Sequence, residues 1–203
     1  MTLEGIDMRI SNGFDDAERT QVAALYWQAF GAKLGSVMRP VTTAHAFFQD
    51  VLDPRFALVA RDAQGQLLGV AGFKTATGAL ANGGARDLAR HYGLLGALWR
   101  GPLLMLLERS VEPGVLQMDG IFVDSAARGR GVGSALLDAI TEHARALGCD
   151  RVRLDVIDTN PRAQALYERK GFVAAGRQTT GPFRWLFGFR TATRMERAVI
   201  ALD

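Results

Sequence analysis

The sequence predicts a layered domain of the α/β or α+β class. Strand-like and helix-like segments alternate along its 203 residues, without an internal repeat or a low-complexity tract. Hydrophobic residues make up 48% of the chain and charged residues 22%, which is enough apolar material for a compact core. We therefore expect a single domain over residues 1–203.

Charge balance and cysteine content restrict the kinds of ligand and compartment. A net charge of +3 and a pI near 9.4 suit an anionic small molecule as well as nucleic acid. The single Cys149 excludes an internal disulfide, and the three histidines lack ligand spacing, so no metal site is expected. Residues 1–14 are polar, and the apolar run at 94–107 is too short to cross a bilayer. These features predict a soluble, cytoplasmic protein.

The first part of the chain predicts two helices and three strands. Val22, Leu25 and Phe30 recur at helical spacing, and Ala63-Gln64-Gly65 is typical of a hairpin turn. The expected elements are a strand at 8–11, helices at 15–35 and 43–52, strands at 56–61 and 67–74, and a loop at 78–84.

The second part predicts a helical segment broken by Gly101-Pro102, followed by alternating strands and helices. A proline inside a helix removes a hydrogen bond, so the break is expected there. Gly148 is placed to end the helix that precedes it, and that helix has an apolar stripe made of Val132, Leu136, Ile140 and Ala144. The expected elements are helices at 87–98 and 102–109, a strand at 115–123, a helix at 133–147, a strand at 151–157, a helix at 161–170 and a strand-rich tail at 172–201.

The most informative feature is a glycine turn between the strand at 115–123 and the helix after it. It reads Arg128-Gly129-Arg130-Gly131-Val132-Gly133. Glycines that open a helix can direct several backbone N–H groups at one anion, and the helix dipole and two arginines favour a phosphate there. A dinucleotide fingerprint would need glycine where Ser134 stands, and a nucleotide P-loop would need a lysine after the turn. The turn therefore predicts a pyrophosphate site of another kind.

A second motif covers residues 160–172 and has the pattern N-x-x-A-x-x-L-Y-x-x-x-G-F. Asn160 is a favourable N-cap, the proline after it suits the first helical position, and Gly171 suits the helix end. Ala163 and Tyr167 share one face of the predicted helix.

The two motifs together resemble the GNAT superfamily of N-acetyltransferases. Its motif [Q/R]-x-x-G-x-[G/A] is matched by Arg128, Gly131 and Gly133, and the second motif is typical of the same enzymes. The likeness is close over residues 115–172, and the flanking elements agree in their order alone. The resemblance implies a mixed, mostly antiparallel central sheet flanked by helices, of the acyl-CoA N-acyltransferase type.

The resemblance also implies acetyl-CoA as co-substrate and an amine acceptor. It places the pantetheine arm along the central strand and the pyrophosphate on the glycine turn, and it puts Asn160 near the pantetheine and Tyr167 near the CoA sulfur. Each of these features also has a purely structural alternative. Asn160 could serve only as a helix cap, Tyr167 could be a core tyrosine, and the turn could be only a tight connection. The implied binding residues are Ile121, Phe122, Val123, Arg128, Gly129, Arg130, Gly131, Val132, Gly133, Ser134, Asn160, Ala163 and Tyr167.

The chemistry requires a neutral amine, an oxyanion donor and an acid for the departing thiolate. A backbone N–H near Val123 suits the oxyanion, and the Tyr167 phenol suits the thiolate. Gln117, Asp119, Ile121 and Val123 are expected on one strand face. Gln117 cannot accept a proton, so Asp119 is the candidate base, with a purely structural carboxylate or a water chain as alternatives.

The chain departs from the family in a helical insertion at about residues 86–110. Its leucines and Trp99 allow three interpretations: a helical pair packed on its own core, a substrate lid, or a homodimer contact. Alternating strand faces explain the basic and aromatic residues of the tail more simply than nucleic-acid stacking does. These residues are Arg184, Trp185, Phe187, Phe189, Arg190, Arg194 and Arg197. We expect an acetyl-CoA-dependent N-acetyltransferase. A catalytically silent acyl-CoA-binding module and, less favoured, a nucleic-acid-binding protein are the alternatives.

Overall fold

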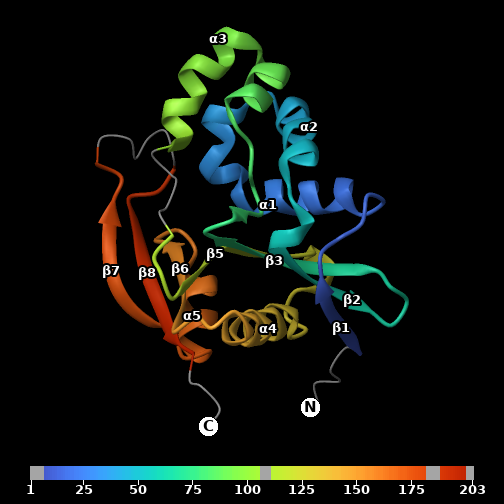
Figure 1. Ribbon diagram of the computed structural model, residues 1–203, viewed down its shortest axis with the longest axis vertical. Helices are drawn as coiled ribbons and strands as arrows, with labels where there is room; N and C mark the ends of the chain where they lie inside the picture. Colours follow the sequence, from blue (N-terminus) through green and yellow to red (C-terminus); the bar gives the residue numbers. More distant parts are fainter. Residues whose placement is uncertain (1–6, 106–110, 182–187, 200–203) are drawn as a thin grey trace.

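A computed structural model describes residues 7–105, 111–181 and 188–199 of the chain. In this part of the chain a central sheet lies between two helical layers (Figure 1). The strands are β1 (Met8–Asn12), β2 (Ala57–Asp62), β3 (Leu67–Thr75), β4 (Gly78–Ala79), β5 (Val115–Val123), β6 (Arg151–Ile157), β7 (Val173–Thr179) and β8 (Thr191–Ala198). The α-helices are α1 (Arg19–Met38), α2 (Val41–Val51), α3 (Ala85–Met105), α4 (Val132–Ala146) and α5 (Pro161–Arg169).

The sheet is mixed and mostly antiparallel, as predicted. Its strand order is β1-β2-β3-β5-β6-β8-β7, with β4 paired to β3 outside this path. The pairing of β5 with β6 is parallel, whereas the other pairings between described strands are antiparallel. The parallel pair requires a crossover, and α4 supplies it.

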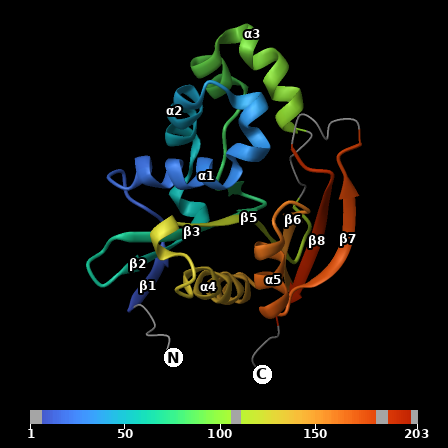
Figure 2. The same ribbon diagram turned by 180° about the vertical axis from the view of Figure 1, so that it is seen from behind.

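The helices divide between the two faces of the sheet. Helices α1, α2 and α3 lie on one side, and α4 and α5 lie on the other (Figures 1 and 2). Helix α4 packs through the apolar stripe that the sequence predicts, since Val132, Leu136, Ile140 and Ala144 are all buried. This packing leaves the N-terminus of α4 at the end of β5.

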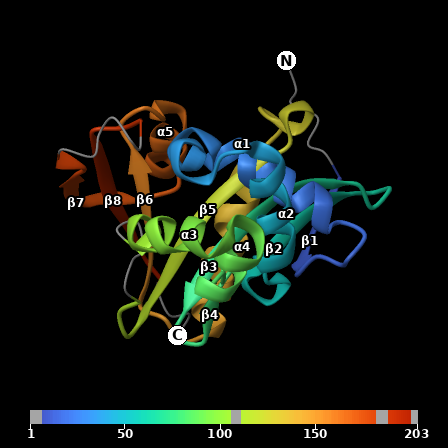
Figure 3. The same ribbon diagram turned by 90° about the horizontal axis from the view of Figure 1, so that it is seen from above.

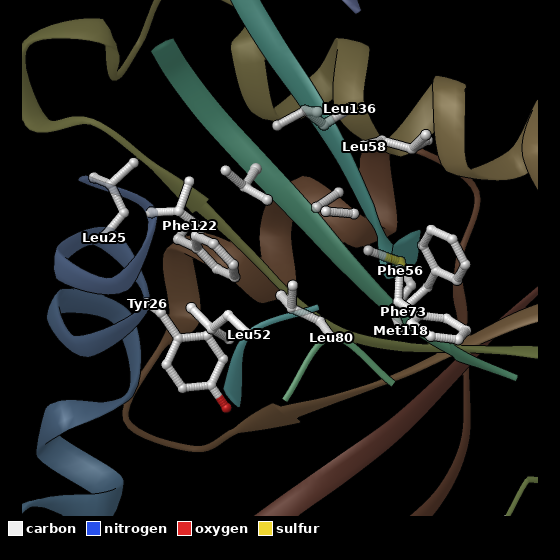
Figure 4. Close-up of a cluster of buried hydrophobic side chains, with 14 of the residues drawn as sticks. Leu25, Tyr26, Leu52, Phe56, Leu58, Phe73, Leu80, Met118, Phe122 and Leu136 are labelled. Atoms are coloured by element: carbon white, nitrogen blue, oxygen red, sulfur yellow. The ribbon is translucent and has the colours of Figure 1, made fainter. Parts of the chain in front are cut away.

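The core between α1 and the sheet is aromatic. Tyr26 of α1 lies 5.6 Å from Phe122 of β5 and 4.6 Å from Phe30, measured between ring centroids. Figure 4 shows Leu25 and Tyr26 beside Phe122, with Leu52 and Leu80 close by. Phe122 thus contributes its side chain to the core.

Some element boundaries in the first half of the chain differ from the sequence prediction. Helix α1 begins at Arg19 because Asp15 and Glu18 exchange backbone-to-side-chain bonds of 3.1 Å, which hold a turn before the helix. The loop expected at 78–84 contains the short strand β4, and Leu52 forms an isolated bridge with Ala81.

The break predicted at Gly101-Pro102 is wrong. Helix α3 runs through Pro102, and its non-helical residue is Gly93, with φ 71° and ψ 168°. A positive φ of this kind favours glycine, so the chain turns where glycine permits it. Arg100 secures the second part of α3 by donating 2.8 Å and 3.0 Å bonds to the carbonyls of Val37 and Arg39.

Up to Met105, the segment predicted as a helical pair on its own core does form two helical stretches, but the separate core is wrong. Within the described part of α3, Leu88 is buried, whereas Leu94, Leu95 and Leu98 are 81%, 83% and 74% exposed. The helix packs on α2 and α1, and it lies above the sheet when the molecule is viewed from above (Figure 3). Two of the leucines that suggested a separate core, Leu106 and Leu107, lie outside the described residues. No helix in the described ranges is long and apolar enough to cross a membrane.

Candidate active site

The site begins where β5 and β6 separate. Their parallel ladder pairs Val115 with Arg151 and ends with the pair Gln117 and Arg153. Beyond that pair β5 continues beside β3, where Phe122 pairs with Val70. The backbone edge of β5 that faces away from β3 therefore borders a gap in the sheet.

Two residues of β5 direct their backbone groups toward this gap. The N–H of Asp124 donates to the carbonyl of Leu68 on β3 at 2.9 Å. Because backbone groups alternate in direction along a strand, those of Ile121 and Val123 point away from β3. This edge is the expected partner for a pantetheine arm, and Val123 offers the predicted N–H for an oxyanion.

Asp119 occupies a β-bulge rather than a regular position. Phe73 pairs with Met118 and Gly72 pairs with Gly120, so Asp119 is the extra residue on β5. The bulge interrupts the predicted alternation, in which Gln117, Asp119, Ile121 and Val123 would share one strand face. Residues from Gln117 to Ile121 instead line the cavity described below, and Val123 does not. Oδ2 of Asp119 accepts the backbone N–H of Leu80 at 3.2 Å, which fixes the carboxylate beside β4.

The glycine turn has the geometry of an anion site. Gly129 and Gly131 have φ values of 76° and 85°, which favour glycine, and α4 begins directly after Gly131. The first bond of the helix runs from the N–H of Ala135 to the carbonyl of Gly131 at 3.0 Å. The preceding N–H groups of Val132, Gly133 and Ser134 therefore lie at the open helix end.

Close packing and two arginines surround this turn. A Cβ on Gly133 would come within 3.2 Å of Leu166, so glycine also allows α4 to approach α5. Arg128 donates from Nε to the carbonyl of Val123 at 3.2 Å, which ties the turn to the end of β5. Arg128 and Arg130 are both exposed, so their guanidinium groups are accessible to a phosphate.

The second motif folds as predicted around α5. Oδ1 of Asn160 accepts the N–H of Ala163 at 3.2 Å, so Asn160 caps the helix. Tyr167 is 8% exposed, and its ring lies 6.0 Å from that of Phe172. Burial raises the pKa of the Tyr167 phenol to about 12, because the charged phenolate would lose its hydration. The hydroxyl therefore keeps its proton at neutral pH.

One cavity of about 820 Å³ joins these parts. It lies between α1, α2 and α3 on one side and β5, β6 and α5 on the other. The predicted site residues that line it are Asp119, Ile121, Asn160, Ala163 and Tyr167. The glycine turn lies outside the cavity lining, at the far end of β5, which suits a long ligand that extends from the cavity to the turn.

The cavity also has walls that sequence reasoning missed. Tyr26 and Phe30 come from α1, Lys74 from β3 and Asp155 from β6. Helix α3 adds an apolar lining made of Leu88, Gly101, Leu104 and Met105. Trp99, the residue of α3 singled out from the sequence, is 45% exposed and lies outside this lining.

The remaining sequence candidates have structural surroundings. Phe189 of the basic and aromatic tail is buried, and Arg197 lies 3.7 Å from Asp138, while Arg184, Trp185 and Phe187 lie outside the described residues. Cys149 is partly buried against the core. Within the described ranges, no three His, Cys, Asp or Glu side chains gather as a metal site requires.

Comparison with solved structures supports the fold. A structure described as an acetyltransferase superposes with a TM-score of 0.62 at 23% identity and covers 95% of this chain and 100% of its own. A GCN5-related N-acetyltransferase from Kribbella flavida gives a TM-score of 0.61 at 19% identity, over 95% of this chain and 98% of its own.

Sequence relatives match over short stretches. The mycothiol acetyltransferase of Beutenbergia cavernae is 54% identical over 50 residues, which are 25% of this chain and 17% of that protein. Glucosamine 6-phosphate N-acetyltransferase 1 of Oryza sativa subsp. japonica is 39% identical over 56 residues, 28% of this chain and 32% of that protein. The chain thus spans less than half the length of these relatives.

The family model of the acetyltransferase (GNAT) family matches residues 19–172, which include α1, the central strands, the glycine turn and α5. This chain belongs to the GNAT acetyltransferase family.

Proposed function

We propose that this chain transfers the acetyl group of acetyl-CoA to a primary amine by direct attack. The observation that carries the proposal is a single cavity, lined by both Asp119 and Tyr167, beside the gap between β5 and β6. GNAT enzymes use acetyl-CoA, and a similar fold from Salmonella typhimurium was solved with it. The matched relatives are named for different amine acceptors, so the names alone do not select one.

In this proposal, acetyl-CoA binds along β5 and ends at the glycine turn. The backbone groups of Ile121 and Val123 pair with the pantetheine arm, while those of Phe122 bond to β3, and Asn160 and Ala163 border the arm. The pyrophosphate binds the turn at 128–134, where helix N–H groups and two arginines meet. The whole of residues 1–203 acts as one domain.

The reaction needs no covalent enzyme intermediate. The acceptor ammonium loses a proton to Asp119, directly or through water, and its nitrogen attacks the thioester carbonyl carbon. The Val123 N–H stabilises the oxyanion. When the C–S bond breaks, the thiolate takes a proton from Tyr167. The nitrogen of the tetrahedral intermediate gives up its second proton, which returns to the Tyr167 phenolate through water, and the amide and free CoA leave.

The primary test measures turnover of acetyl-CoA with a panel of primary amines. The readout is the thiol of the CoA that is released. Release of CoA that depends on an amine supports the proposal. Tight acetyl-CoA binding without release of CoA for any amine would favour the silent acyl-CoA-binding module. Nucleic-acid binding that falls steeply with salt, and that acetyl-CoA does not alter, would favour the nucleic-acid alternative.

The role of Asp119 has a separate test. Replacement Asp119→Asn removes the base, so turnover should fall most near neutral pH and recover as the pH approaches the amine pKa of about 10. The recovery reflects an amine that has already lost its proton in solution. Equal activity of both proteins at every pH would mean that Asp119 has a structural role, or that a water chain alone removes the proton.

A cytoplasmic location and a homodimer complete the proposal. The single cysteine is consistent with a reducing compartment. The outer face of α3 offers an apolar surface for a second copy, with Leu94, Leu95 and Leu98 exposed.

A further inference from the structure

We propose that the acceptor is a singly charged primary amine with an apolar body, such as an arylalkylamine, and that Asp155 positions its ammonium group. This inference rests on the proposed acetyltransferase function. It adds a substrate class and a second acidic residue, neither of which the sequence motifs indicate.

The walls of the acceptor side are apolar. Helices α1 and α2 line the cavity with aromatic and aliphatic side chains, and α3 adds further aliphatic ones from above. Apolar side chains of this lining are Tyr26, Phe30, Leu34, Met38, Phe47, Phe48, Val51, Leu88, Leu104 and Met105. A ligand that fills this space must bury apolar surface to bind well.

The charged groups are few and lie at the sheet end of the cavity. Among the described residues that line it, Lys74, Asp119 and Asp155 carry charge. The two carboxylates can accept hydrogen bonds from an ammonium group, which suits a cationic acceptor. A phosphate would meet two carboxylates there, and a polyamine would place its further charges against the apolar walls.

The two carboxylates come from the two strands that border the gap, and both line the cavity. The ladder of β5 with β6 pairs Val115 with Arg151 and ends at Gln117 and Arg153. Asp119 and Asp155 line the cavity beyond the last pair, one on each strand.

This arrangement divides the work between the two acids. Asp119 is fixed beside β4 by the N–H of Leu80, and it accepts the proton. Asp155 holds the ammonium group from the β6 side, so the nitrogen lies between the strands, where the thioester is expected. Asp155 orients and binds the acceptor amine. It takes no part in bond making or breaking, which is that of the acetyl transfer itself.

The first experiment compares acceptors with the unmodified protein at fixed acetyl-CoA. We expect kcat/KM for 2-phenylethylamine to exceed that for ethylamine by about 10- to 100-fold, as burial of an aromatic ring predicts. Spermidine and glucosamine 6-phosphate should be poorer acceptors than 2-phenylethylamine. If either is better, the inference is overturned while the proposed function stands. If no amine releases CoA, the proposed function itself fails.

The second experiment assigns Asp155. Replacement Asp155→Asn should raise KM for 2-phenylethylamine at least tenfold and leave KM for acetyl-CoA unchanged, whereas Asp155→Glu should restore part of the loss. Aniline, which is uncharged at neutral pH, should show little change. The matched control is Asp138→Asn on the opposite face of the sheet, where the carboxylate pairs with Lys170.

Two outcomes would overturn the role of Asp155. An equal loss for aniline and 2-phenylethylamine would show a structural effect in place of ammonium recognition. Unchanged KM for 2-phenylethylamine in the Asp155→Asn protein would place the ammonium site elsewhere.

Discussion

Replacement Gly131→Val tests whether the glycine turn binds the pyrophosphate. A Cβ at Gly131 would meet no protein atom within 4 Å, so the valine side chain projects into the open space over the turn. That space is where the phosphate oxygens must approach the N–H groups of α4. We expect acetyl-CoA affinity to fall.

The size of the effect follows from the hydrogen bonds that the valine side chain would prevent. A hydrogen bond to a charged group contributes about 1.5–3 kcal/mol, so the absence of two such bonds costs about 3–6 kcal/mol. This corresponds to about a 10²- to 10⁴-fold weaker Kd, measured by titration calorimetry. S-acetylpantetheine lacks the pyrophosphate, and its Kd should be equal in both proteins.

A matched variant separates binding from backbone strain. Gly148 lies at the other end of α4 with φ 69°, and a Cβ there also meets open space. Valine at a positive φ should cost at least about 1–2 kcal/mol of stability at either position. Gly148→Val should therefore lower Tm as Gly131→Val does and leave acetyl-CoA affinity intact. A folded Gly131→Val protein with wild-type affinity for acetyl-CoA would refute the pyrophosphate assignment.

Three further predictions follow from the cavity and from α3. Tyr167→Phe should lower turnover by about 10²- to 10⁴-fold with little change in acetyl-CoA affinity, and equal turnover with chemistry rate-limiting would exclude Tyr167 as the acid. Because the pKa of this phenol is raised to about 12, its ionisation should not reduce the wild-type rate below about pH 11. Leu104→Ala should alter the acceptor KM more than the acetyl-CoA KM, while Trp99→Ala should alter neither; the reverse pattern would contradict the lining described above. Leu94→Ser combined with Leu98→Ser should convert a dimer to a monomer in sedimentation, and an unchanged mass would remove the dimer proposal.

The local geometry of the proposed cofactor half was predictable because its signals are local. The glycine turn, the Asn160 cap and the apolar stripe of α4 each lie within a few residues of chain. Short-range rules for caps and glycine conformations describe such features well. The structure confirms the turn at Gly131 and the cap of Asn160 on Ala163, while the roles of these residues toward acetyl-CoA stay proposals.

The acceptor half was not predictable because it depends on contacts between distant segments. Tyr26 was recognised as part of a helix, but nothing in the sequence places it beside β5. The bulge at Asp119 depends on pairing with β3, and Asp155 reaches the cavity through the pairing of β5 with β6. The break in α3 was placed at Pro102, although Arg100 holds the helix in place there and Gly93 supplies the turn.

The gap between β5 and β6 requires a cause, because parallel strands gain hydrogen bonds when they stay paired. Arg153, at the last pair, is buried and donates to Glu196 on β8 at 2.8 Å and to both carboxylate oxygens of Glu112 at 2.6 Å and 2.7 Å. These bonds fix β6 against β8 and against the segment before β5 at this level of the sheet.

Beyond this fixed point, β5 follows β3 and the bulge at Asp119 increases its local twist. Strand β6 instead stays paired with β8 as far as Ile157. The two strands therefore separate because each keeps a different partner. The cavity opens just beyond the last pair of the ladder between β5 and β6. For this reason the catalytic and specificity residues proposed above lie on both sides of a single gap.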